Sequence, residues 1–445
     1  MINDKKIIVL DDDPTGTQTV HNISIFTDWG VQSIEDGFKE DSPLFYILTN
    51  SRALTEKETK NIHTEIATNI SIVAKKLNKQ FIIISRSDST LRGHYPLETT
   101  VLKEVIENEM NCEFSGEILI PFFKAGGRIT KDNIHYIQEG ENITPVANTE
   151  FARDRTFRYT KSHLGEWIQE KTKGEFLEND TTYISIDDLQ TKNTQKIYDK
   201  LLNVSNFNKV VVNATEYEHI QNFCEPLHMA LKFKNFMFRS SASFVRVFGG
   251  INTKELLKKQ DIITNDSKNG GLIIVGSHVK KTTLQFSELK KLSYLNFIEL
   301  NCNLIFNPTQ FKEEISKILV SCEDNIKKGI TTVVYTSRQR IDIGENKEEE
   351  ELSLSTQISQ GITSIVKKLT ERPKYIIGKG GITSSDIATK GLGIKKATVL
   401  GQVLPGIPVW LTANESKFNN MGYIVFPGNV GSETALKEVV EMLES

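Results

Sequence analysis

One stretch decides the fold of this chain: Lys5-Lys6-Ile7-Ile8-Val9-Leu10-Asp11-Asp12-Asp13-Pro14-Thr15-Gly16-Thr17-Gln18. Its short apolar run is rich in β-branched residues and predicts a buried strand, which the Asp, Pro, Thr and Gly residues that follow cannot extend. The three acids therefore stand at the carboxyl end of a strand, the edge of an open α/β sheet where ligands bind. Adjacent carboxylates repel one another unless a cation or a donor-rich ligand lies among them. The stretch predicts a site that uses a metal or handles phosphate.

Apolar runs recur along the chain, with helix-like segments between them. In the first half they span residues 44–48, 81–84, 117–120, 182–186 and 210–212, and an amphipathic segment spans residues 56–77. In the second half they span residues 272–275, 297–300, 332–335 and 375–377. Strand, helix and strand at this spacing predict parallel sheets flanked by helices. Residues 128–158 are less regular, and we interpret them as an insertion or a loop-rich excursion.

The chain is long enough for two or three globular domains, with 445 residues of which 38% are hydrophobic and 25% charged. The polar, Gly-rich stretch at residues 265–271 is the best candidate for a domain boundary, which falls there or some tens of residues earlier. The pattern predicts two α/β domains, each a largely parallel sheet flanked by helices, at residues 1–240 and 265–445.

Charge and cysteine usage narrow the class of partner. A net charge of -3 and a pI near 6.3 argue against a nucleic-acid binder, so small ligands are the expected partners. The four cysteines have no metal-binding spacing and suit reduced thiols in the cytosol. The start is too polar for a signal peptide, and no apolar run approaches the roughly 20 residues that span a bilayer. We therefore expect a cytoplasmic protein that binds neither membranes nor nucleic acid.

Two polar clusters follow strands of the first half. Arg52 stands just past the run at residues 44–48, where its planar guanidinium could hold a carboxylate. The run at residues 81–84 is followed by Ser85-Arg86-Ser87-Asp88-Ser89-Thr90-Leu91-Arg92-Gly93-His94, far more polar groups than a helix cap requires. Such a mixture suits a small polyhydroxy acid, whose carboxylate is bound by Arg and whose hydroxyls are bound by Asp and Ser.

Glycine-rich turns follow strands of the second half. They are Gly276-Ser277-His278, Gly378-Lys379-Gly380-Gly381-Ile382-Thr383-Ser384-Ser385-Asp386 and Pro427-Gly428-Asn429-Val430-Gly431. Glycines let backbone amides approach phosphates closely, so the three turns together predict a nucleotide site. The chain contains no GxxxxGK[ST] motif, and no GxGxxG follows a strand, which excludes the commonest nucleotide-binding loops.

A phosphatase is the competing interpretation. Asp11-x-Asp13-x-Thr15 after a strand is similar to the first motif of haloacid-dehalogenase-type phosphatases, in which the first Asp is the nucleophile. Ser85 and the pair Asp187-Asp188 could serve as later motifs of that family. The spacings are loose, and this interpretation gives no role to residues 87–93 or to the glycine-rich turns.

Taken together, the motifs resemble those of the four-carbon acid sugar kinase family, ATP-dependent enzymes that phosphorylate threonate, erythronate, 3-oxo-tetronate and related acids. The resemblance covers essentially the whole chain, and it is carried by Asp12-Asp13-Pro14-Thr15-Gly16, Asp88-Ser89-Thr90-Leu91-Arg92-Gly93 and Gly380-Gly381-Ile382-Thr383-Ser384. It implies an amino-terminal acid-sugar-binding domain, a carboxy-terminal nucleotide-binding domain and an active site in the cleft between them.

The resemblance also implies site residues. The acid sugar would be held by Asp12, Asp13, Arg52, Arg86, Ser87, Asp88 and Ser89, and ATP by Ser277, Gly380, Gly381, Ile382, Thr383 and Gly428. Two departures stand out: many relatives carry Asp or Glu in place of Ile382, and many carry Ala in place of Asp11. If the missing carboxylate normally orders Mg²⁺ or the nucleotide, Asp386 or Asp11 could substitute for it. Mg²⁺ is expected with ATP, and its ligands stay unassigned.

The expected reaction is transfer of the γ-phosphoryl group of ATP to a terminal hydroxyl of a small hydroxy acid, with positioning and charge neutralisation supplying most of the rate. Asp13 is the first candidate to orient the attacking hydroxyl and take its proton, and Asp12 is the second. Arg52 and Arg86 would clamp the substrate carboxylate. A sensor that binds acid sugars or nucleotides without catalysis remains an alternative, and formation of a homodimer is left open.

Overall fold

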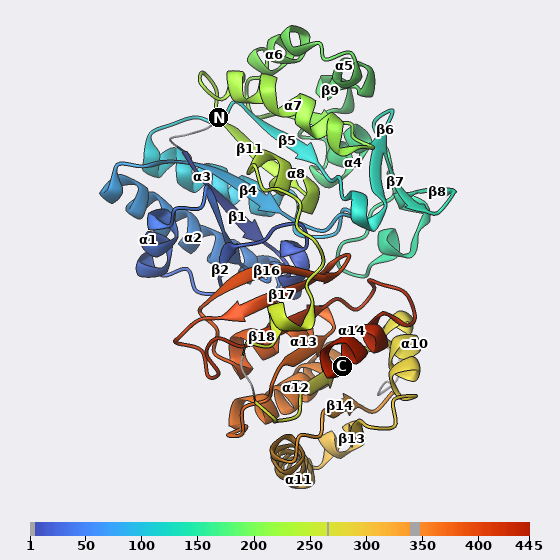
Figure 1. The fold of residues 1–445 in the computed structure, drawn as a ribbon. Helices are drawn as coiled ribbons and strands as arrows, with labels where there is room; N and C mark the ends of the chain where they lie inside the picture. Colours follow the sequence, from blue (N-terminus) through green and yellow to red (C-terminus); the bar gives the residue numbers. More distant parts are fainter. Residues whose placement is uncertain (1–4, 265–266, 339–347) are drawn as a thin grey trace. The chain divides into compact units, whose positions relative to one another are not determined.

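The computed structural model describes residues 5–264, 267–338 and 348–445, the side chains of residues 348–353 excepted. The chain divides into two compact units, unit 1 at Met1–Thr253 and unit 2 at Lys254–Ser445 (Figure 1). Asn265 and Asp266, which belong to the predicted boundary stretch, lie outside the described residues. Both units have the predicted α/β architecture of mostly parallel sheet with flanking helices.

Unit 1 is built on a parallel sheet with the strand order β2-β3-β1-β4-β11-β5-β10-β9. Its strands are β1 (Lys5–Asp11), β2 (Ile23–Phe26), β3 (Leu44–Leu48), β4 (Gln80–Arg86), β5 (Gly116–Ile120), β9 (Thr182–Ile184), β10 (Asn208–Val212) and β11 (Phe236–Ser240). Its helices are α1 (Val31–Lys39), α2 (Glu56–Leu77), α3 (Leu97–Met110), α4 (Leu164–Lys171), α5 (Ile186–Gln190), α6 (Thr194–Leu202), α7 (Tyr217–Ala230) and α8 (Ala242–Phe248).

Strand β1 lies inside this sheet, between β3 and β4. Its side chains from Ile7 to Asp11 are buried, which is why the run is apolar on both faces rather than alternating. The core beside it includes Ile8, Ile70 of α2 and Ile83 of β4. Helix α2 starts at Glu56 because Thr55 caps it, accepting a hydrogen bond from the backbone N–H of Glu58 while the Glu58 side chain bonds back. The expected strand and helix at residues 44–48 and 56–77 are confirmed at these bounds.

Residues 128–158 contain regular structure that the sequence analysis did not predict. Strands β6 (Arg128–Lys131), β7 (Ile134–Glu139) and β8 (Asn142–Pro145) form a three-stranded antiparallel sheet. The link between β6 and β7 is the pair Asp132-Asn133, and both residues have positive φ, at 50° and 64°. This is the backbone of a two-residue hairpin turn that favours Asn and Asp. The short 3₁₀ helices η4 (Val146–Asn148) and η5 (Glu150–Arg153) follow.

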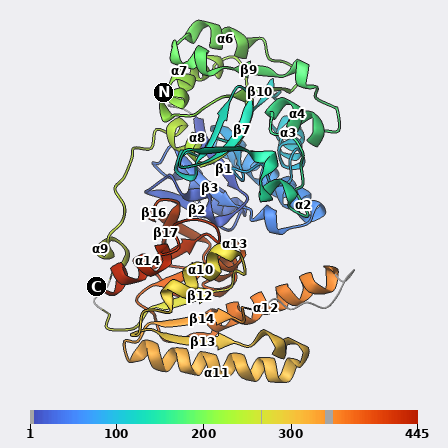
Figure 2. The same cartoon turned by 90° about the vertical axis from the view of Figure 1, so that its right-hand side faces the viewer.

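Unit 2 has a sheet with the strand order β13-β14-β12-β15-β18-β17-β16. Its strands are β12 (Leu272–Val275), β13 (Asn296–Leu300), β14 (Thr332–Thr336), β15 (Ile376–Lys379), β16 (Lys396–Leu404), β17 (Ile407–Thr412) and β18 (Gly422–Phe426). Its helices are α9 (Lys259–Ile262), α10 (Lys280–Leu289), α11 (Pro308–Lys327), α12 (Glu348–Lys368), α13 (Gly381–Asp386) and α14 (Ala435–Glu444). The strands from β13 to β18 in this order pair in parallel, and β16 and β17 add an antiparallel hairpin. Helix α10 packs with α14 and α11 with α12 (Figure 2).

Strand register brings the predicted clusters together within each unit. In unit 1 Asp11 of β1 is level with Leu48 of β3 and with Arg86 of β4, so residues 11–13, 49–52 and 86–92 leave the sheet side by side. In unit 2 Val275 of β12 is level with Lys379 of β15, which is level with Phe426 of β18. Each unit therefore gathers its polar turns at the carboxyl edge of its sheet, where parallel sheets bind ligands.

Candidate functional site

The acid cluster of unit 1 begins with Asp11, whose side chain is fully buried. Its Oδ1 lies 3.0 Å from Nη1 of Arg86, while its Oδ2 has no hydrogen-bond partner and lies against Gly16. A side chain at residue 16 would collide with this carboxylate, which explains the glycine. Burial raises the pKa of Asp11 to about 7, although Arg86 opposes the shift. Asp11 is thus a structural partner of Arg86, enclosed beneath the site.

Asp12 is also buried, and its carboxylate is shared among several donors. Oδ2 lies 3.2 Å from Nε of Arg52 and accepts a 2.5 Å hydrogen bond from Oγ of Ser87, while Oδ1 lies 3.6 Å from Nη1 of Arg86. Burial raises the pKa of Asp12, and the two arginines act in the opposite direction. Asp12 joins the turns that follow β1, β3 and β4.

Asp13 has the most accessible carboxylate of the three acids, with 19% of its side chain exposed. Asp13 is the N-cap of the 3₁₀ helix η1 (Pro14–Thr17), and its Oδ1 accepts hydrogen bonds from the backbone N–H and the hydroxyl of Thr15. Its Oδ2 lies 3.2 Å from Nη2 of Arg52. Burial alone would raise the pKa of Asp13, but Arg52 and the Thr15 hydrogen bonds hold it below the ordinary value. The group is therefore ionised at neutral pH, with one oxygen turned to a cation.

Asp88 lies on the turn after β4 between two arginines. Its Oδ1 is 3.3 Å from Nη1 of Arg52, and its Oδ2 is 2.8 Å from Nε of Arg92. These cations outweigh the effect of burial and keep the pKa of Asp88 well below its ordinary value. The turn is fixed to β7 by His135, whose ring Nε2 donates to the carbonyl of Ser89 at 2.8 Å. Burial lowers the pKa of His135 to about 4, so its ring is neutral.

The structure thus brings together all the residues of unit 1 that sequence analysis assigned to the acid sugar: Asp12, Asp13, Arg52, Arg86, Ser87, Asp88 and Ser89. It also shows what the two arginines already contact. Arg52 bonds to Asp12, Asp13 and Asp88. Arg86 is buried and pairs with Asp11 and Asp12. Their nearest anions are carboxylates of the chain itself.

A buried charged pair supports the cluster, and sequence analysis missed it. Nη1 of Arg239, on β11, lies 2.5 Å from Oε2 of Glu98, and Ser51 donates to the other Glu98 oxygen at 2.6 Å. Gly93 has a φ of +124°, and a side chain there would lie 2.7 Å from both Arg239 and Ser87. The available signal was the arginine that directly follows the apolar run Phe236-Met237-Phe238, because a buried charge requires a partner.

The glycine turns of unit 2 converge on Ser277. A side chain at Gly380, whose φ is +120°, would lie 2.8 Å from Cβ of Ser277, and one at Gly428 would lie 3.2 Å from its hydroxyl. A side chain at Gly276 would collide with Thr383. The three turns therefore pack closely at one place where their contacts with Ser277 and Thr383 admit only glycine, and glycine backbone of this kind can bind phosphate. This packing is consistent with a nucleotide bound by the turns that carry Ser277, Gly380, Thr383 and Gly428.

The other two residues assigned to the nucleotide lie at the start of α13. Gly381 is the first residue of α13, and Ile382 follows it with 61% of its surface exposed. An exposed isoleucine at this position offers an apolar surface and no charge. Asp386, suggested as a substitute for a missing acid, already accepts from the Ser359 hydroxyl at 2.6 Å and pairs with Lys390 at 2.6 Å. Among the described residues no group of three or more His, Cys, Asp or Glu is arranged to hold a metal ion.

Comparison with protein families follows the same division. Residues 7–248 match a model described as a sugar-binding N-terminal domain, and residues 272–436 match one described as a nucleotide-binding C-terminal domain. The chain belongs to the four-carbon acid sugar kinase family. Its two units accordingly correspond to a sugar-binding and a nucleotide-binding domain. No curated protein sequence matches this family member.

Two solved structures share the fold of this acid sugar kinase family member over nearly the whole chain. One is a Salmonella typhimurium LT2 protein named for tRNA synthase activity, with a TM-score of 0.70 and 14% identity over 97% of this chain and 98% of its own. The other is protein HI1011 of Haemophilus influenzae, with a TM-score of 0.63 and 15% identity over 98% of this chain and 100% of its own. At such identities the likeness shows the fold alone.

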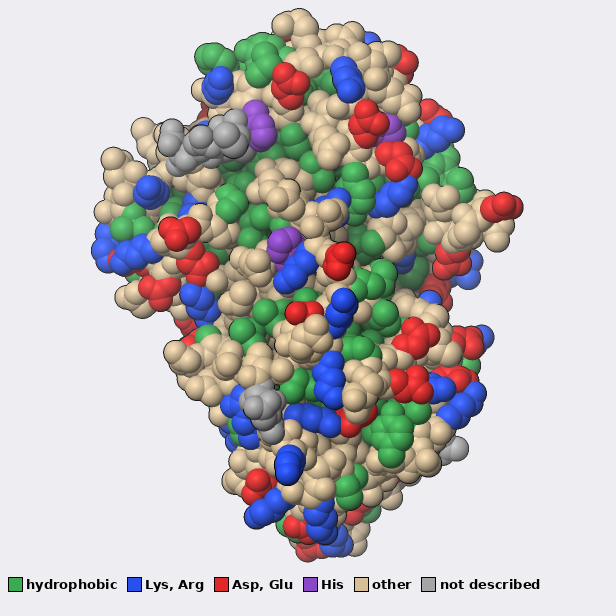
Figure 3. Space-filling model, in the orientation of Figure 1, with side chains coloured by type: hydrophobic (Ala, Val, Ile, Leu, Met, Phe, Trp, Pro, Cys, Tyr) green, Lys and Arg blue, Asp and Glu red, His purple; other side chains and the backbone are tan. Residues whose placement is uncertain are grey.

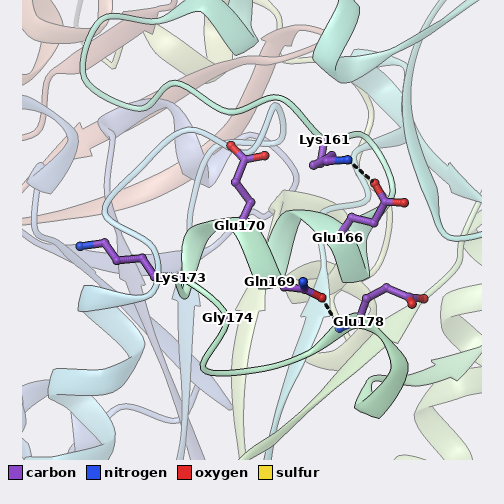
Figure 4. Close-up of a pocket in the computed structure, with 7 residues that line it drawn as sticks. All are labelled: Lys161, Glu166, Gln169, Glu170, Lys173, Gly174 and Glu178. Carbon is purple, nitrogen blue, oxygen red and sulfur yellow. Dashed lines mark hydrogen bonds and ion pairs between the residues drawn. The ribbon is translucent and has the colours of Figure 1, made fainter.

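The face drawn in Figure 3 carries Lys and Arg side chains interspersed with Asp and Glu. A depression beside α4 is lined by Lys161, Glu166, Gln169, Glu170, Lys173, Gly174 and Glu178 (Figure 4). Several of its groups bind one another: Lys161 pairs with Glu166 at 3.1 Å, and Gln169 accepts from the backbone N–H of Glu178 at 2.9 Å. In the parts of the chain that the structure describes, no helix has the length and apolarity to cross a membrane.

Proposed function

We propose that this chain is an ATP-dependent kinase that phosphorylates a terminal hydroxyl of a four-carbon sugar acid such as threonate, erythronate or 3-oxo-tetronate. The observation that carries the proposal is the state of Asp13. It is ionised, held by Thr15 and Arg52, and more accessible than Asp11 and Asp12, which lie beneath it. A carboxylate of this kind can accept a hydrogen bond from an alcohol and orient it for attack.

The site residues of unit 1 would each have a separate role in the reaction. Asp13 orients the attacking hydroxyl and accepts its proton, with Asp12 held beside it through Arg52. The ionised Asp88 and the Ser87 and Ser89 side chains bind the remaining hydroxyls. Arg52 neutralises the three carboxylates around it, so that an anionic substrate can approach. Little covalent chemistry falls to the protein, because phosphoryl transfer depends mainly on positioning and charge neutralisation.

In unit 2 Ser277, Gly380, Thr383 and Gly428 would hold the nucleotide, with Gly381 and Ile382 beside them at the start of α13. ATP supplies the phosphoryl group, and Mg²⁺ is expected with it, with ligands still to be found. The reaction requires the two substrates to meet. A shared active site between the two domains stays a prediction.

The phosphatase alternative is disfavoured by the position of its nucleophile. Asp11 would have to attack phosphorus, yet its side chain is fully buried, with one oxygen on Arg86 and the other against Gly16. Asp188, the candidate for a later motif, is bound by Lys196 at 2.7 Å and Lys200 at 2.8 Å. A residue engaged in this way has no free carboxylate to offer a metal.

An assay of ADP formation tests the proposal. The purified protein is mixed with ATP and MgCl₂ and offered threonates, erythronates, their 3-oxo forms and longer aldonates one at a time. We expect ADP formation that depends on one acid, with a turnover of about 1–100 per second as is usual for kinases. NMR of the product identifies the phosphorylated hydroxyl.

The same assay separates the alternatives. Phosphate release from phosphorylated sugar acids without ATP would favour the phosphatase. Tight binding of an acid sugar or of ATP with no turnover on any acid would favour a sensor. Either result would overturn the kinase proposal.

A further inference from the structure

Two arginines of unit 1 lie over one aromatic ring. The guanidinium carbon of Arg92, on the turn after β4, is 4.9 Å from the centroid of Phe151, and that of Arg128, the first residue of β6, is 5.9 Å from it. Phe151 belongs to the 3₁₀ helix η5. Packing against a ring favours the planar guanidinium in a fixed orientation and lowers the entropy that it loses on binding an anion.

The two arginines differ in their partners. Arg92 pairs with Asp88 at 2.8 Å and with Asp154 at 3.8 Å. Arg128 donates to the backbone carbonyl of Gly126, its Nε is buried without a partner, and within the described residues it forms no ion pair. Burial lowers the pKa of Arg128 and the charge of Arg92 adds to this effect, while the charges of Asp88 and Glu139 act in the opposite direction without cancelling it. A bound anion would stabilise the charged guanidinium in this position.

The sheet that carries Arg128 is hydrogen-bonded to the turn after β4, which carries Asp88 and Ser89. Thr130 of β6 pairs in register with His135 of β7, and its hydroxyl bonds to the ring Nδ1 at 2.9 Å. The other ring nitrogen of His135 bonds to the carbonyl of Ser89 at 2.8 Å. Tyr159 donates to the carbonyl of Thr90 at 2.7 Å. Arg128 is thus held in a defined position relative to Asp88, whose charge acts on it directly.

We propose that Arg128 binds the carboxylate of the acid substrate and selects acids over neutral polyols. This inference rests on the proposed function and adds a residue to its site. Arg52 and Arg86 form ion pairs with carboxylates of the chain, and Arg92 forms two such pairs. Of these four arginines, Arg128 is the one that forms no ion pair with a described residue, and its Nε has no hydrogen-bond partner. Its fork of N–H donors can bind a carboxylate through two parallel hydrogen bonds, an arrangement that lysine cannot reproduce.

The test compares Arg128→Gln and Arg128→Lys with the wild type on paired substrates, potassium threonate or erythronate and the matching neutral alcohol, threitol or erythritol. For Arg128→Gln we expect kcat/KM for the acid to fall about 100-fold, mainly through KM, because a charged pair is lost. Arg128→Lys keeps the charge without the fork and should lose about 10-fold. The kcat/KM for the alcohol should stay within about twofold in both variants. Arg155→Gln, at an exposed arginine of the same segment, is the matched control and should behave as wild type.

Calorimetry of potassium threonate and erythronate binding without nucleotide gives a second readout that does not need turnover. If the wild type binds an acid but forms no ADP with any, the kinase proposal fails, and loss of that binding in Arg128→Gln still supports the carboxylate role. If Arg128→Gln does not fold, Arg128→Lys decides. An unchanged KM and an unchanged affinity for the acid in either folded variant would overturn the inference, as would equal losses for acid and alcohol.

Discussion

The candidate sites of the two units are formed by different chemical groups, ionisable side chains in unit 1 and glycine backbone in unit 2. In unit 1 the carboxyl edge of the sheet is filled by ionisable side chains, with Asp11, Asp12 and Asp13 bound to Arg52 and Arg86 at 3.0–3.6 Å. In unit 2 the same edge of a similar sheet is formed by glycine backbone, since a side chain at Gly276, Gly380 or Gly428 would press on Ser277 or Thr383.

This difference predicts which kind of substitution would impair each site. A site made of paired charges loses function when a charge is removed, because its partners are left unmatched in a buried place. A site made of bare backbone loses function when volume is added, because the ligand must approach the main chain. Removal of side chains should therefore affect unit 1, and addition of side chains should affect unit 2.

The strongest test of this contrast removes one charge from unit 1 and leaves its shape. Asp13→Asn should lower the turnover of the acid sugar about 1,000-fold, since the amide still fills the place but cannot accept a proton. The affinity for an ATP analogue should not change. Asp41→Asn, at an exposed acid of the same unit, serves as the control. If both Asp13→Asn and Asp12→Asn turn over at near wild-type rates, the assigned role is wrong.

A smaller effect is expected from adding one carbon atom to unit 2. Gly380→Ala places a side chain on a backbone with a φ of +120° and 2.8 Å from Cβ of Ser277. Such a conformation costs about 1–3 kcal/mol of stability for a non-glycine residue. Relief of the strain and of the contact with Ser277 would shift the turn away from the nucleotide, so the affinity for an ATP analogue should fall about 10- to 30-fold. Binding of the acid sugar to unit 1 should be unaffected.

The matched control for that variant is Gly393→Ala. Gly393 also has a positive φ, at +61°, but a side chain there would meet nothing within 4 Å. It therefore carries backbone strain without the collision. Calorimetry with the analogue compares the two variants, and equal losses of nucleotide affinity would contradict a specific role for the contact with Ser277.

How much could be predicted from the sequence depends on how locally each feature is encoded. The strand from Lys5 to Asp11 and the helix from Glu56 to Leu77 carry their own apolar pattern and capping residues, and the sequence predicted both. The polar turns were also predictable, because strand ends are marked by Pro, Gly and hydroxyl residues. Their convergence follows from parallel strands alone.

What the sequence did not reveal depends on partners far along the chain. Arg239 pairs with Glu98, and no local pattern links residues 141 positions apart. The role of Arg128 depends on Phe151 and on the antiparallel sheet that begins with it, in a region whose mixed composition was taken for loop. The Asp132-Asn133 hairpin turn was the available signal for that sheet. The hairpin of β16 and β17 was likewise absent from the predicted strand, helix and strand pattern.

The smallest expected effect concerns Lys379, a buried charged side chain in one of the glycine turns of unit 2. Its Nζ donates to the carbonyl of Pro427 and lies 4.5 Å from the ring centroid of Phe426, so it ties the turn after β15 to the turn after β18. Burial lowers the pKa of Lys379 to about 7 from 10.5. Folding therefore releases a proton at pH values between these two, and stability should rise with pH across that window.

Between pH 7 and pH 8 the free energy of unfolding of unit 2 should increase by about 1 kcal/mol from this group, because each pKa unit is worth about 1.4 kcal/mol. Lys379→Met should lack that increase. Urea unfolding followed by hydrogen exchange of unit 2 peptides measures the difference between the two proteins at each pH. If the wild type and Lys379→Met show the same pH dependence, Lys379 is charged when folded, and the contrast between a charged site and a backbone site does not hold for unit 2.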